Sequence, residues 1–92
     1  MGTFHNDKGE LHGITVVVET NGAQTWVGRC DTIDDAGVHL LDADHHEAGG
    51  LAAPSKQEWL AQAARFGVWP RRPSVLVPAA AVTSVRRLGD LR

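Results

Sequence analysis

The sequence predicts a mainly β protein, a small and strongly bent five-stranded barrel with one short inserted α-helix at about residues 55–67. Three observations predict this architecture. Apolar and polar residues alternate up to about residue 42, a capped segment of helical periodicity follows residue 54, and two short apolar stretches follow a proline-rich segment. The alternation and the short stretches indicate strands, and the capped segment indicates the helix.

The first three strands are predicted from period-two alternation. Apolar side chains occupy every second position in residues 14–19 and 26–31, and residues 38–40 continue the pattern. The segments are separated by Asn21-Gly22 and by Asp35-Ala36-Gly37, which are turn sequences because Asn, Asp and Gly tolerate positive φ. The three strands are therefore expected to form a meander.

The helix is predicted from its caps and from its apolar face. Ser55 and Glu58 have the spacing of a capping box, in which each side chain binds the backbone amide of the other residue, and Gly67 is placed as a C-cap. The following residues are expected to pack against the sheet: Trp59, Ala63 and Phe66, with Leu60 and Ala64 beside them.

Two more strands are predicted at residues 75–77 and 82–85. The chain is then one domain, residues 1–92, in which residues 1–10 form an N-terminal tail and residues 43–73 form an excursion that carries the helix. The acidic and histidine-rich residues after Leu41 are expected to mark the point where the chain leaves the sheet.

Two segments resemble the conserved motifs of the Sm and Sm-like (LSm) proteins. Residues 76–85 are similar to the second motif in their hydrophobic spacing, and the two segments cover about half of the chain. The first motif is matched, in order and nearly in spacing, by Leu11, Gly13, Val16, Val18, Gly22, Trp26, Gly28, Asp34 and Leu40-Leu41-Asp42-Ala43.

The resemblance implies an Sm-like barrel, which is a form of SH3-like barrel, and homo-oligomeric rings in which the fourth strand of one subunit pairs with the fifth strand of the next. It also implies RNA binding at the inner loops of the ring. The family places an Asn and an Arg-Gly pair there to hold a base, whereas this sequence has Gly37-Val38 and Pro78-Ala79. A helix between the third and fourth strands also replaces the family's N-terminal helix. Specific recognition of RNA bases is therefore not expected.

Charge is distributed unevenly along the chain. Residues 1–47 contain nine acids and two bases, and residues 48–92 contain two acids and seven bases, so the halves carry −7 and +5. Such asymmetry is typical of an interaction face, or else the two halves interleave in the fold and their fields cancel. The net charge of −2 differs from the basic balance of dedicated nucleic-acid-binding domains, so nucleic acid is expected to bind weakly.

Two groups of residues are candidate sites. His45, His46 and Glu47 are residue types that bind zinc or another divalent ion, although adjacent histidines on a strand point to opposite sides. A second group is assigned to a partner or oligomer surface, through an aromatic anchor, arginines suited to phosphate contacts or intersubunit pairing, and strand edges. These residues are Trp69, Arg71, Arg72, Val75, Val77, Arg86 and Arg87.

Catalysis is not expected. Cys30 is the sole cysteine, so an internal disulfide is excluded and a reducing cytoplasm is the expected compartment. Neither Cys30 nor Ser74 lies in a recognisable nucleophile motif, and no segment predicts a membrane span. The predicted function is a non-catalytic, self-associating binding or scaffold module without a cofactor. The alternative is a domain that binds or senses a divalent metal through His45, His46 and Glu47.

Overall fold

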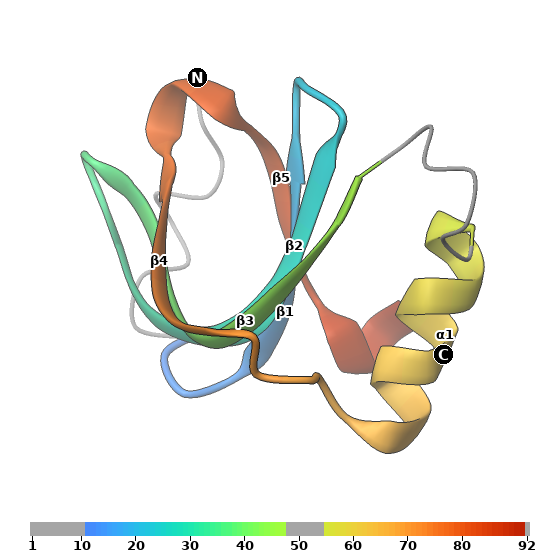
Figure 1. The fold of residues 1–92 in the computed structure, drawn as a ribbon. Helices are drawn as coiled ribbons and strands as arrows, with labels where there is room; N and C mark the ends of the chain where they lie inside the picture. The colour runs from blue at the N-terminus through green and yellow to red at the C-terminus, as the bar shows by residue number, and fades with distance from the viewer. Residues whose placement is uncertain (1–10, 48–54, 92) are drawn as a thin grey trace.

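Five antiparallel strands form one sheet in the order β4-β3-β2-β1-β5, which is bent into an open barrel (Figure 1). The computed structural model describes residues 11–47 and 55–91. Helix α1, Lys56–Phe66, lies between β3 and β4, and short 3-10 helices η2 and η3 span Ala79–Ala81 and Leu88–Leu91. The strands are β1 Thr15–Thr20, β2 Gln24–Asp34, β3 Gly37–Glu47, β4 Arg72–Pro78 and β5 Val82–Arg87.

The inner face of the sheet carries the larger core cluster. The predicted alternation is confirmed, since Val16 and Val18 point inward and Val17 points to the opposite face. The pairing of β2 with β3 shifts register near Gly28 and again near Asp31, and irregularities of this kind bend and twist a strand pair. The buried members of this cluster are Leu11, Val16, Val18, Cys30, Ile33, Val38, Leu40, Ala43 and Val77.

Helix α1 begins and ends where its caps predict. The Ser55 hydroxyl accepts a hydrogen bond from the Glu58 amide at 3.2 Å, and the Glu58 carboxylate accepts one from the Ser55 amide at 3.3 Å. At the other end the Gly67 amide donates to the Ala63 carbonyl at 2.9 Å, and the φ of Gly67 is 91°. The capping box and the glycine cap are therefore both present.

The helix packs against the outer face of the sheet and forms a second, smaller cluster. Its buried members are Val17, Val27, Ala63 and Leu88. Trp59 and Leu60 pack against them from the helix, as predicted. Phe66 does not, because it lies at the end of the last turn and is 80% exposed, so the expectation that it packs against the sheet is wrong.

The third strand is longer than the sequence predicts. Residues 42–47 were expected to leave the sheet, but β3 continues to Glu47 and its last residues pair with the start of β2, Thr25 opposite His46 and Gln24 opposite Glu47. The side chain of Ala43 is fully buried and His46 is 9% exposed, so both faces of this segment are partly covered. The segment between β3 and β4 therefore starts after residue 47.

The acidic and basic halves of the sequence interleave in the fold. Glu19 pairs with Lys56 and Arg86, and Asp44 pairs with Arg71, so acids of the first half contact bases of the second. These contacts support local cancellation of the charge asymmetry rather than one acidic and one basic face. In the part of the chain that the structure describes, no helix is long and apolar enough to cross a membrane.

Candidate functional site

The two outer strands of the sheet each have one unpaired edge. Among the described residues, β4 pairs only with β3 and β5 pairs only with β1, so their outer backbone groups have no partner strand. Val77 is 2% exposed and Val75 packs against the same core, so their side chains face the barrel interior. Leu76, which alternates with them, is 46% exposed. An edge contact through β4 would therefore use its backbone and Leu76 rather than the two predicted valines.

The turn between β2 and β3 lies against the connection between β4 and β5. The Ala79 amide donates to the Ala36 carbonyl at 2.9 Å. Gly37 has φ of 141°, and a Cβ at this position would lie 2.0 Å from the Val77 carbonyl oxygen, so no larger residue fits without movement of the backbone. The structure thus brings together the two loops to which the sequence resemblance assigned base recognition.

A carboxylate and a histidine lie beside the first of these loops, near Gly37 and Val38. The Asp34 carboxylate accepts hydrogen bonds from the amides of Ala36 and Gly37, and it lies 3.0 Å from Nε2 of His39. The hydrogen bond from His39 is the main cause that holds the pKa of Asp34 below its ordinary value. Val38 is fully buried, so it presents no group to a ligand.

The His-rich end of β3 does not gather metal ligands. His45 stacks on Trp26 with ring centroids 4.7 Å apart, whereas His46 contacts Trp59 of the helix at 5.5 Å on the other face of the sheet. Glu47 lies 3.7 Å from the ring of His45. Across residues 11–47 and 55–91, no group of three His, Cys, Asp or Glu side chains is placed to hold a metal ion.

Three of the four predicted arginines are engaged in ion pairs within the chain. Arg72 is exposed and has no ion-pair partner among the described residues. The pairs are Arg71 with Asp44 at 3.6 Å, Arg86 with Glu19 at 3.2 Å and Arg87 with Asp90 at 3.1 Å. A ligand phosphate would compete with a carboxylate at each of these three positions.

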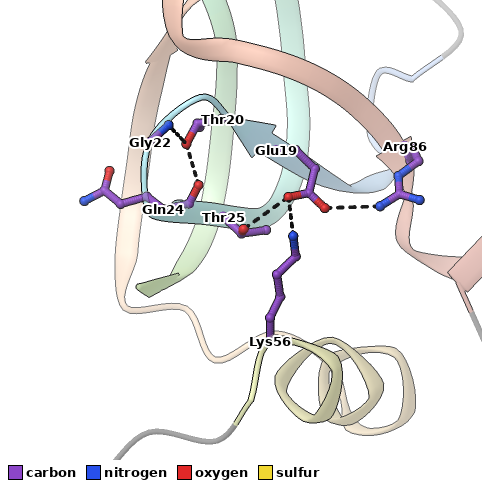
Figure 2. Close-up of polar contacts among 7 residues, drawn as sticks. All are labelled: Glu19, Thr20, Gly22, Gln24, Thr25, Lys56 and Arg86. Carbon is purple, nitrogen blue, oxygen red and sulfur yellow. Dashed lines mark hydrogen bonds and ion pairs between the residues drawn. The ribbon is translucent and has the colours of Figure 1, made fainter. Parts of the chain in front are cut away.

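Glu19 is the centre of a polar network that ties four elements together (Figure 2). Its carboxylate on β1 accepts hydrogen bonds from Lys56 of α1 at 2.7 Å, from Arg86 of β5 at 3.2 Å and from Thr25 of β2 at 3.3 Å. Partial burial acts to raise the pKa of Glu19, but the hydrogen bond and charge of Lys56, with Thr25 and Arg86, lower it below its ordinary value. The network fixes the start of the helix over the sheet.

A groove of about 640 Å³ opens between α1, the end of β3 and the connection that leads to β4. We call it the helix groove; its lining includes Trp59, Ala63, Phe66, Val68 and Trp69. Trp69 was predicted as a partner contact, and it is 71% exposed at this groove. Phe66 was missed because its helical position suggested a core residue; its place next to the Gly67 cap was the available signal.

Comparison of the sequence with protein-family models and with curated proteins finds no match. Comparison of the structure with solved structures does find similar chains. One is the Sm protein of Pyrococcus abyssii solved in complex with a uridine heptamer, with a TM-score of 0.61, 14% identity, and coverage of 95% of this chain and 99% of that one.

A second similar chain belongs to the NatC complex bound to CoA, with a TM-score of 0.57, 14% identity, and coverage of 90% of this chain and 86% of that one. The first match is to an Sm protein over nearly its full length, and the strand order of this chain gives the open five-stranded barrel that the sequence motifs implied. The chain therefore has the Sm-like fold, with an α-helix inserted between its third and fourth strands.

Proposed function

We propose that this protein is a non-catalytic module that self-associates through the edges of β4 and β5 and serves as a binding scaffold. The observation that carries the proposal is the pair of edges, one on β4 and one on β5, that have no partner strand among the described residues. An exposed edge strand is a template for pairing with another chain. Because β4 and β5 are different surfaces, repeated pairing of one with the other is a head-to-tail contact, which closes into a ring when the rotation permits.

The structural similarity to an Sm protein solved with a uridine heptamer supports a binding scaffold. Specific recognition of RNA bases is not part of the proposal. Gly37, Val38, Pro78 and Ala79 offer no polar side chain at the two facing loops, and Val38 is fully buried. Any nucleic acid would depend on exposed arginines, most of which are already paired with acids.

Light scattering during size-exclusion chromatography tests self-association. We expect the full chain at micromolar concentration to have a mass above that of its 9.9 kDa monomer. Leu76→Lys should lower this mass, because a charge on an exposed edge strand opposes strand addition. Ala61→Lys is the matched control, since it adds the same charge on an exposed helix position. A wild-type chain that elutes as a clean monomer would contradict the proposal.

A further inference from the structure

A second cavity, of about 530 Å³, lies where the turn between β1 and β2 approaches the end of β4. We call it the end pocket; its described lining consists of residues 20–24, 26, 47, 76–78 and 81. The Asn21 backbone amide donates to the Ala81 carbonyl at 2.9 Å, and its side chain donates to the Ala80 carbonyl at 3.2 Å. These bonds hold the turn against η2, and a pocket of this volume accommodates a small ligand or an inserted side chain.

Glu47 supplies the charge of the end pocket. Among the described lining residues it is the only one that is charged at neutral pH. Its carboxylate is 64% exposed, and the ion-pair contact it makes within the described chain is with the ring of His45 at 3.7 Å, which carries a charge only when protonated. The carboxylate therefore attracts a cation and repels a phosphate or an acidic side chain.

Strand pairing places this carboxylate on the inner face of the sheet. Glu47 lies opposite Gln24, and His45 lies opposite Trp26 with ring centroids 4.7 Å apart. Residues two apart on a strand share a face, and Trp26 packs against the inner core cluster. Figure 2 shows the Gln24 side chain directed away from the Glu19 network. Gln24, Trp26 and Glu47 therefore line the same side of the end pocket.

The uncharged part of the lining suits an aliphatic stem. Leu76 is 46% exposed, and Val77 and Pro78 line the pocket beside it. Lys and Arg side chains carry their charge on such a stem, which packs on apolar surface while the charged end reaches a polar group. Cations are also attracted to indole rings and form strong hydrogen bonds with carboxylates. The indole of Trp26 and the carboxylate of Glu47 thus favour the same chemistry.

We propose that the end pocket binds an ammonium or guanidinium group on an aliphatic stem, with the cation at Glu47 and the stem against Trp26 and Leu76. Lys and Arg side chains of a partner chain carry such groups, and so do free amines. The lining is made of side chains inside one barrel, so the inference does not rest on self-association through strand edges. It adds a ligand site of defined charge to the proposed scaffold.

Titration of the ¹⁵N-labelled full chain, followed by NMR, tests this inference. N-acetyl-arginine amide and N-acetyl-lysine amide should each cause saturable shifts of the Trp26 indole and Gly22 amide signals, since both residues line the pocket. N-acetyl-citrulline amide has nearly the shape of the arginine compound without its charge, and it should bind at least about tenfold more weakly. The inference is overturned if neither cation gives saturable shifts at these signals, or if the citrulline compound binds equally well.

Glu47→Gln removes the charge and keeps the shape of the side chain. It is expected to fold because the carboxylate is 64% exposed, and it should bind both cations about tenfold more weakly. Asp42→Asn is the matched control, because it removes a carboxylate of the same strand that is 57% exposed and lies outside the pocket. Unchanged binding by Glu47→Gln, or an equal loss in both variants, would overturn the inference.

Three comparisons identify the source of the cation, and each of their outcomes supports a cationic ligand. Tighter binding of a short peptide with Arg between two Leu than of spermidine assigns the pocket to a partner chain, and the reverse order assigns it to a free amine. A lower mass of Glu47→Gln in light scattering assigns the cation to a second copy. Saturable shifts of the pocket signals by a U-rich oligonucleotide would instead overturn the inference. A monomeric chain that binds the cations would contradict self-association and leave this inference standing.

Discussion

At the scale of single residues, Glu19 joins the helix and the last strand to the sheet. It contacts Lys56 at 2.7 Å and Arg86 at 3.2 Å, and its side chain is only 18% exposed. Glu19→Gln should therefore lower the free energy of unfolding by roughly 1–2 kcal/mol near neutral pH, because hydrogen bonds to charged groups are stronger than neutral ones. Thermal or urea unfolding measures the loss. Glu47→Gln is the control, since that carboxylate is 64% exposed and 3.7 Å from its partner.

The same residue predicts a pH dependence. The pKa of Glu19 is lowered in the folded state, after the raising effect of burial is outweighed by Lys56, Thr25 and Arg86. Its contribution to stability is therefore complete above the pKa of an unfolded glutamate and is lost as pH falls through the folded value. The difference in unfolding free energy between wild type and Glu19→Gln should shrink on acidification below pH about 4. A difference that stays constant down to pH about 3 would show that the charge of Glu19 is not responsible.

Single residues also show what the sequence could and could not reveal about the candidate site. Trp69 was predicted to be a partner contact because it stands between Val68 and Pro70 in an extended segment, and the structure places it in the lining of the helix groove. Phe66 has the spacing of a core residue, but it is the last residue of the helix and is 80% exposed. The groove itself needs β3 and α1 to meet, which no local pattern encodes.

At the scale of elements, the helix depends on its N-terminal cap. Ser55→Ala removes the hydroxyl that accepts the Glu58 amide, which should cost about 1 kcal/mol of unfolding free energy. Circular dichroism during thermal unfolding measures this loss. Ser74→Ala, on an exposed position of β4, should change stability far less. Equal effects of the two substitutions would mean that the cap contributes nothing specific.

The elements also differ in how far the sequence predicts them. Alternation in residues 14–19 and the paired caps Ser55 and Gly67 act over a few residues, so the first strand and the helix were placed correctly from local patterns. The end of β3 was placed too early because residues 42–47 are mostly polar. Residues 44–47 pair with Gln24–Val27, and His46 contacts Trp59 of α1; both partners are distant in sequence. Tertiary contacts therefore extended this strand.

At the scale of the whole molecule, the interleaved charges predict weak binding of RNA. If Arg71, Arg72, Arg86 and Arg87 all contacted phosphates of a single strand, the logarithm of affinity would fall with the logarithm of salt with a slope near −3, about 0.7 per contact. Competition from Asp44, Glu19 and Asp90 should make the slope shallower. Titration of labelled U-rich and A-rich oligonucleotides measures both affinity and preference. Submicromolar affinity with a clear preference for one of them would contradict this expectation.

The buried thiol of Cys30 can report how often the barrel opens. This sole cysteine of the chain is 2% exposed in the main cluster, and burial, followed by the charge of Asp31, raises the pKa of its thiol. Because the thiolate is the reactive form, the folded chain should react with a thiol reagent far more slowly than the chain in denaturant. The residual labelling rate at neutral pH then measures how often the folded barrel exposes its interior. If subunits stabilise one another, this rate should fall as protein concentration rises, so one chemical group would report on both folding and assembly.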